Sequence, residues 1–342
     1  MSCINRLVCL TKVGEKMTES QNAVNPGVFD LKLKLDKGQV FSKQNGYNFP
    51  VTYRQTVRPR EENSDRRRLD MNTMAPEMMA LKDRLKATWM SGDYGYFATF
   101  MKAGAMEFLD ELNLEPGMRM LDVGCGAGQI AIPAALRGAQ VTGIDLASNL
   151  LDQARTQARF AEVKINFEQG DAETLPCDDE SFDLVVSLIG AMFAPRPERV
   201  ASELVRVCRT GGRIVMANWT PQGFVGELFR TVAKFVPPPE IMPSPVKWGE
   251  EETVRQRLHA GLVELNCSLR RFPFFYPFPP RDVVGLYRTH YGPINRAFAS
   301  LDKKGQESLR QALEQLWIDH NVAEDGTTQY PSEYLLVTAV KG

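Results

Sequence analysis

The stretch MLDVGCGAGQI, residues 120–130, decides the fold. It begins with a short apolar run and continues into three closely spaced glycines, Gly124, Gly126 and Gly128. Glycine lacks a Cβ, so a run of this kind lets the backbone turn sharply and approach a ligand closely. We therefore expect a strand that ends in a ligand-binding loop.

Strand-like and helix-like patterns alternate on both sides of this stretch. Apolar helical periodicity separates successive β-like runs, which indicates a doubly wound α/β fold with a mostly parallel sheet. Two later runs would complete a seven-stranded, Rossmann-like sheet. Ligands in such sheets bind at the carboxyl ends of the strands, near the switch point. The strands are expected at 118–123, 140–145, 163–171, 182–190, 213–219, 263–278 and 331–342.

Three local details of the intervening helices follow from the sequence. Ser148 is a candidate N-cap for the helix at 147–160. Pro133 lies inside an expected helix and should bend it. The helix at 197–209 should stop at Gly211.

The chain divides into four expected parts. Residues 1–75 form an N-terminal extension, partly disordered, with a candidate β-hairpin. Residues 76–236 form the α/β core with its N-terminal helices. Residues 237–325 are lid and substrate-proximal insertions that include a late strand, and 326–342 supply the final sheet strand. In the extension, residues 29–36 alternate apolar and charged side chains, as in a half-buried strand. Residues 54–70 carry six arginines and four acids, as in a solvated linker, although a basic contact patch is an alternative.

Composition excludes several classes of protein. The formal net charge of −1 provides no global attraction to nucleic acid. The six cysteines form no C-x-x-C pair and the chain has three histidines, so no metal site is expected. No apolar run approaches the length of a membrane span. Residues 1–16 lack a convincing targeting pattern, so the expected location is cytoplasmic.

The glycine spacing distinguishes two ligands, a nicotinamide dinucleotide and S-adenosylmethionine. The dinucleotide fingerprint G-x-G-x-x-G fails, because Gln129 occupies the place of its third glycine. Asp122 precedes the glycines, and Asp145 and Asp171 follow the next two strands. Carboxylates at successive strand ends suit the hydroxyl and amino groups of a nucleoside. The alternative is that these acids cap the following helices.

The chain resembles the class I S-adenosylmethionine-dependent methyltransferases. The resemblance is carried by LEPGMRMLDVGCGAGQIAIPAALRGAQVTGIDLAS, FEQGDAETLPCDDESFDLVVSLIGAMFAP and ELVRVCRTGGRIVMANWTPQG. It covers residues 80–225 well and the later part more loosely, and it does not extend to residues 1–75. S-adenosylmethionine is the cofactor that the resemblance implies.

The resemblance also implies which residues contact the cofactor. The glycines approach the methionine part, Asp145 holds the ribose and Asp171 contacts the adenine. Cys125 is expected in the loop without nucleophilic work. The full set of implied cofactor-binding residues is Trp89, Tyr94, Asp122, Gly124, Cys125, Gly126, Gly128, Asp145, Leu146, Asp171, Ala172, Ser187, Leu188 and Ile189.

The methyl acceptor is expected to be a small or medium, partly hydrophobic molecule. The turn after the fourth strand lacks the proline-containing motif of enzymes that methylate base amino groups. The aromatic run at 272–280, with Met192, Phe193 and Trp248, suggests an apolar pocket. His290 is the candidate catalytic base. A cofactor-binding protein without methyl transfer and a nicotinamide-dependent oxidoreductase remain alternatives, and the oligomeric state is open.

Overall fold

The computed structural model describes residues 33–36, 39–44, 47–51 and 74–342. The chain divides into two compact units, Met1–Val57 and Arg58–Gly342. In the first unit, the strands β1 (Leu33–Asp36), β2 (Gln39–Gln44) and β3 (Tyr47–Val51) form a three-stranded antiparallel sheet. Part of the strand expected at 29–36 and the whole linker expected at 54–70 lie outside the described residues.

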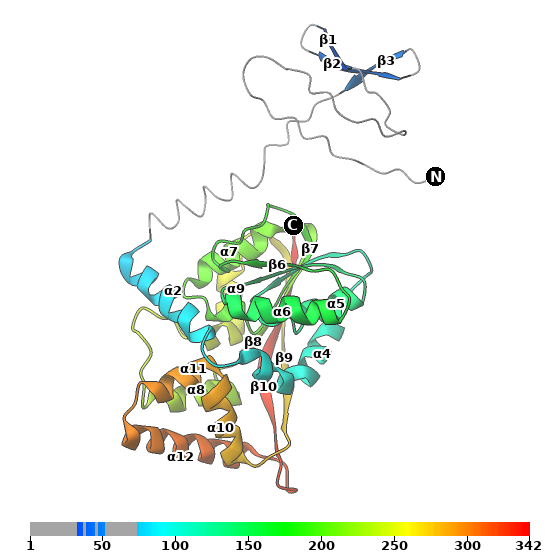
Figure 1. Cartoon of the computed structure of the whole chain (residues 1–342). Coiled ribbons are helices and arrows are strands. Elements are labelled where there is room, and N and C mark those ends of the chain that lie inside the picture. The colour runs from blue at the N-terminus through cyan, green and yellow to red at the C-terminus, as the bar shows by residue number, and fades with distance from the viewer. Residues whose placement is uncertain (1–32, 37–38, 45–46, 52–73) are drawn as a thin grey trace, which may run out of the picture. The chain divides into compact units, whose positions relative to one another are not determined.

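The second unit contains a seven-stranded sheet flanked by helices (Figure 1). Its strands are β4 (Arg119–Val123), β5 (Gln140–Asp145), β6 (Asn166–Gln169), β7 (Phe182–Leu188), β8 (Cys208–Trp219), β9 (Leu262–Tyr276) and β10 (Thr328–Lys341). Its helices of the α type are α2 (Pro76–Trp89), α3 (Tyr94–Ala98), α4 (Lys102–Glu111), α5 (Ala131–Leu136), α6 (Ser148–Phe160), α7 (Pro197–Val207), α8 (Phe224–Ala233), α9 (Glu251–Arg257), α10 (Pro280–His290), α11 (Gly292–Ala299) and α12 (Lys303–His320). Short 3-10 turns occupy Thr99–Met101, Ala191–Phe193 and Pro245–Gly249.

The strand order is β6-β5-β4-β7-β8-β10-β9. The pairs from β6 through β8 are parallel, whereas β10 runs antiparallel to both β8 and β9. The chain leaves β4 toward β5 and β6 and later returns to β7 on the other side of β4. This reversal places a crevice at the carboxyl end of β4. The expected mostly parallel, seven-stranded sheet is confirmed.

Burial explains why the central strands are so apolar. Leu184, Val185 and Val186 of β7 and Leu121 of β4 are fully buried, because helices cover both faces of a parallel sheet. Beyond the carboxyl end of β8, helices α8, α10, α11 and α12 gather around the extended β9–β10 pair (Figure 1). Among the described residues, no helix is both long enough and apolar enough to cross a membrane.

Two of the three local expectations are wrong. Ala147, not Ser148, is the residue that precedes α6, and it caps the helix with no side-chain hydrogen bond. Pro133 lies between Ile132 and Ala134, whose N–H groups both bond the carbonyl four residues earlier, so it removes one bond of this series as expected, and the bend stays a prediction. Helix α7 ends at Val207, before Gly211, because the chain enters β8 at Cys208 and pairs with β7.

Two glycines let the loops after β4 and β7 touch. A Cβ on Gly190 would lie 2.8 Å from the Cα and carbonyl oxygen of Gly124 and from the carbonyl oxygen of Val123. Backbone atoms on both sides leave no flexible group that could yield. The contact therefore fixes the spacing between the two strand ends at the switch point.

We predict that Gly190→Ala lowers the free energy of unfolding by about 1–3 kcal/mol, the usual cost of forcing a methyl group into a filled site. Gly285→Ala is the matched control, because a Cβ on Gly285 in α10 meets no atom within 4 Å. That change should stabilise the helix by about 0.5–1 kcal/mol. Urea unfolding measures the free energy of unfolding of both variants. Equal changes in the two variants would contradict the close contact inferred at Gly190.

Candidate functional site

A cleft of about 820 Å³ opens at the carboxyl ends of β4, β5 and β7. It lies at the switch point where α/β sheets bind ligands. Helix α2 and the segment after it contribute one wall. The lining residues are Lys82, Leu85, Trp89, Tyr94, Val123, Gly124, Gly126, Ile144, Asp145, Leu146, Leu150, Gly170, Asp171, Ala172, Leu188, Ile189, Gly190, Ala191, Phe193, Ala194 and Pro195.

The glycine loop crosses the floor of this cleft. Gly124 and Gly126 line it with φ of +73° and +54°, in the left-handed region that favours glycine. Gly128 does not line it, although its φ is +90°. A Cβ on Gly128 would lie 2.8 Å from the side chain of Ile132, so this glycine serves helix packing instead.

Asp145 ties the end of β5 to the glycine loop. Its Oδ2 accepts a hydrogen bond of 2.8 Å from the Gly126 N–H, and its Oδ1 accepts one of 2.8 Å from the Ala147 N–H. Burial raises the pKa of this carboxyl above its ordinary value, while the backbone N–H groups oppose the rise. Each oxygen keeps a second lone pair, so the carboxylate retains capacity for ligand hydroxyl groups.

Asp122 presents an unpaired buried oxygen behind the loop. The side chain is buried, the Ala131 N–H donates to the carboxylate, and Oδ2 has no hydrogen-bond partner. Burial and the nearby Asp145 charge raise the pKa of Asp122 to about 7. Asp122 borders a second cavity of about 390 Å³, which shares Tyr94, Gly124 and Gly126 with the cleft.

Asp171 holds helix α2 against the cleft. Its Oδ2 lies 2.5 Å from Lys82 Nζ, and its Oδ1 accepts from the Glu173 N–H. Lys82 also pairs with the fully buried carboxylate of Glu173, which lies 2.6 Å from the Arg196 guanidinium. Lys82 was not among the residues predicted for the site, because a lysine on an amphipathic helix is usually exposed to solvent.

The end of β7 contains one structural and one strained residue. The Ser187 hydroxyl donates to the Val123 carbonyl and accepts from the Ala191 N–H, so it joins strand ends and does not line the cleft. Ile189 lines the cleft with φ of +60°. That conformation costs a β-branched residue about 1–3 kcal/mol, and such strain is concentrated at functional sites.

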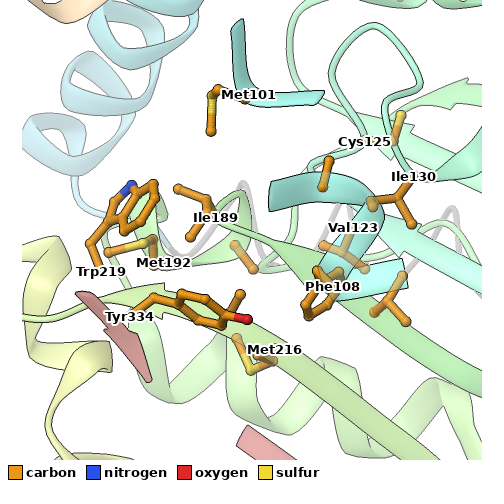
Figure 2. Close-up of a cluster of buried hydrophobic side chains, with 14 of the residues drawn as sticks. Met101, Phe108, Val123, Cys125, Ile130, Ile189, Met192, Met216, Trp219 and Tyr334 are labelled. Carbon is orange, nitrogen blue, oxygen red and sulfur yellow. The ribbon is translucent and has the colours of Figure 1, made fainter. Parts of the chain in front are cut away.

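A small cavity lined mainly by aromatic side chains, here called the aromatic chamber, adjoins the cleft. The cleft and the chamber share Trp89, Tyr94, Ile189 and Phe193, so they meet at one boundary. Figure 2 shows Ile189 at this end of the core beside Trp219 and Met192, with Cys125 and Ile130 at the other end. The chamber is lined by Trp89, Tyr94, Phe97, Met101, Ile189, Phe193, Trp219, Val225, Leu228, Phe274, Tyr287 and Tyr291.

The apolar pocket expected from sequence is therefore built differently. Of the run 272–280, only Phe274 lines the chamber among the described residues. Trp248 is buried elsewhere, with the Arg257 guanidinium 4.7 Å from its ring. Phe193 lines the chamber as expected, whereas Met192 is packed in the core.

The other candidate groups lie away from the cleft. His290 ends α10, its ring lies 4.8 Å from that of Tyr96, and it lines neither the cleft nor the chamber. Cys125 is buried, and burial raises the pKa of its thiol, so the thiol stays protonated. Among the described residues, no group of three or more histidine, cysteine, aspartate or glutamate side chains could hold a metal ion.

Comparisons with known proteins agree with this geometry. A family model for a methyltransferase domain matches residues 121–216, from the glycine loop to β8. An uncharacterized protein of Mycobacterium tuberculosis is 35% identical over 274 residues, which cover 79% of this chain and 98% of that protein. Phosphatidylethanolamine N-methyltransferase of Cereibacter sphaeroides is 41% identical over 105 residues, 30% of this chain and 51% of that protein.

The fold is also found among solved structures. The YcgJ protein of Bacillus subtilis aligns with a TM-score of 0.50 at 18% identity, covering 70% of this chain and 98% of that chain. The sequence motifs, the matched methyltransferase domain and the strand order of the sheet all indicate the same family. The chain belongs to the class I S-adenosylmethionine-dependent methyltransferases, with S-adenosylmethionine as methyl donor.

Proposed function

We propose that this methyltransferase carries a methyl group from the cleft to a small or medium, partly hydrophobic acceptor held in the aromatic chamber. The observation that carries the proposal is the shared boundary of the two cavities at Trp89, Tyr94, Ile189 and Phe193. A donor in the cleft and an acceptor in the chamber would meet there. The nicotinamide alternative is set aside by the family and by the glycine spacing.

The residues of the cleft fit S-adenosylmethionine. Asp145 offers a carboxylate for ribose hydroxyls, and Ala172 and Leu146 offer apolar surface for the adenine beside Asp171. The unpaired Oδ2 of Asp122 suits the positively charged amino group of the methionine part. When bound, the cofactor supplies an electrophilic methyl group on a sulfonium.

The protein's own contribution is positioning and exclusion of water. In-line displacement needs the acceptor atom about 3–3.5 Å from the methyl carbon, and such alignment can supply roughly 7–11 kcal/mol of the barrier reduction. The side chains of Phe97, Tyr287 and Tyr291 are buried and line the chamber. A lining of this kind favours acceptors that carry apolar surface. The role of His290 as a base stays a prediction from the sequence, and His290 lines neither the cleft nor the chamber.

We predict that Asp145→Ala weakens binding of S-adenosylmethionine by about 1–3 kcal/mol, because hydrogen-bond groups of the ribose and of Gly126 lose their partner. Isothermal titration calorimetry gives the affinity for S-adenosylmethionine, with NAD as comparison. Asp152→Ala, which removes only the exposed ion pair with Arg155, is the control and should leave the affinity unchanged. Because Asp145 also holds the loop, urea unfolding is measured alongside. An unchanged affinity in Asp145→Ala would refute the ribose assignment.

We also predict that affinity for S-adenosylmethionine rises with pH up to about 7. The pKa of Asp122 is raised to about 7 without ligand, so below that pH its carboxyl is mostly protonated. A cationic amino group favours the ionised form and lowers the pKa in the complex, so binding releases a proton below pH 7. The dissociation constant should therefore fall by up to about tenfold per pH unit between pH 5.5 and 7 and level off above.

Asp122→Asn tests the assignment of this pH dependence. The amide does not titrate, so calorimetry at pH 5.5, 6.5 and 7.5 should show a flatter profile for the variant than for the natural protein. The same slope in both proteins would assign the proton to another group and contradict the role of Asp122.

A further inference from the structure

We infer that the acceptor's reactive group is an uncharged amine, and that its cationic methylation product is held by the ring faces of the aromatic chamber. The inference rests on the proposed function, which places the acceptor in this chamber. It adds the chemical class of the acceptor atom.

The rings that line the chamber pack around Tyr291. The Tyr291 ring centroid lies 5.0 Å from Phe97, 5.4 Å from Tyr287, 6.1 Å from Trp89 and 6.3 Å from Tyr94. All five side chains line the cavity. Aromatic faces carry partial negative charge, so a lining of this kind attracts a cation and repels an anion.

Two tyrosine hydroxyls in the chamber lack strong hydrogen-bond partners. The Tyr94 hydroxyl contacts only the thioether of Met101, at 3.7 Å, and no hydrogen bond joins the Tyr291 hydroxyl to another described residue. Tyr287 differs, because its hydroxyl bonds those of Tyr276 and Tyr330, each at 3.1 Å. Tyr94 and Tyr291 therefore remain available to an acceptor, as donors or as acceptors.

The chamber contains no base suited to an alcohol acceptor. Among its described lining residues there is no carboxylate, histidine, lysine or arginine. Burial raises the pKa of both Tyr94 and Tyr291, so their hydroxyls keep their protons at neutral pH. An alcohol keeps its proton at that pH and would need a general base. A carboxylate acceptor would be buried as an unpaired anion against ring faces, which is costly.

A neutral amine satisfies these constraints. Its N–H can donate to a tyrosine oxygen while its lone pair faces the methyl carbon. That lone pair forms the new N–C bond, and the electron pair of the broken C–S bond returns to sulfur, so the sulfonium becomes a neutral thioether. The nitrogen becomes the cation, and the product of an N–H amine releases one proton to bulk water after it leaves the chamber. The positive charge thus passes from sulfur to a nitrogen surrounded by ring faces.

The test compares a cation with its neutral isostere. Choline and 3,3-dimethylbutan-1-ol have nearly the same shape but differ in one charge. Binding of each to the full-length protein is measured by calorimetry in the presence of S-adenosylhomocysteine. We expect choline to bind about tenfold more tightly than the alcohol. Equal affinity, tighter binding of the alcohol, or no choline binding at millimolar concentration would overturn the inference.

Two matched variants locate the effect. Phe97→Leu removes one ring of the lining and should reduce the preference for choline by at least threefold. Phe275→Leu removes an exposed ring of β9 that does not line the chamber, and it should leave the preference unchanged. Tyr291→Phe keeps its aromatic ring and should keep the preference for choline. Its result therefore still tests the inference if Phe97→Leu fails to fold. Loss of the preference in Phe275→Leu or its persistence in Phe97→Leu would place the cation elsewhere.

Binding of S-adenosylhomocysteine distinguishes a failure of the proposed function from a failure of the amine inference. If the protein fails to bind it, the proposed function fails. If it binds and choline shows no preference over its isostere, only the amine inference fails.

Discussion

One carboxylate, that of Asp145, connects the two strand ends on which the site depends. It accepts the Gly126 N–H and the Ala147 N–H, so the glycine loop after β4 is fixed to the end of β5. The Ile144 carbonyl reinforces this connection by accepting the N–H groups of Gly124 and Cys125. Burying a carboxylate is costly unless hydrogen bonds compensate it. The same hydrogen bonds therefore fix the shape of the loop and compensate the burial of the carboxylate.

Distant parts of the chain close the site around this loop. The Lys82 ammonium pairs with Asp171 and with the buried Glu173, which fixes α2 over one end of the cleft. Rings from α2, α3, β8, β9 and α10 make the chamber at the other end. The α/β core thus supplies most of the cleft, whereas the helices before and after it supply much of the chamber.

Much of the fold could be predicted from local pattern. The strand β5 has the bounds expected from its apolar run, because a parallel strand covered on both faces is apolar along its length. The antiparallel strands β9 and β10 complete the sheet as expected. Helix ends were less predictable. The residue before α6 is Ala147, whose carbonyl accepts the N–H groups of Leu150 and Leu151, so Ser148 is already the first helical residue.

The candidate site was predicted in part. Asp145, Asp171 and Gly126 line the cleft, but Gly128 and Ser187 lie behind it in packing and strand-end roles. Lys82 and Tyr291 gave no signal in the sequence, because their importance comes from neighbours far along the chain. Periodicity reports which side chains are buried and not which cavity they face.

The central claim is that donor and acceptor meet where the cleft and the chamber share a wall. A crystal structure of the complex with S-adenosylhomocysteine tests it most directly. We expect the ribose at Asp145, the amino group at Asp122 and the sulfur facing the boundary formed by Tyr94 and Ile189. A sulfur atom directed away from the chamber would contradict the claim.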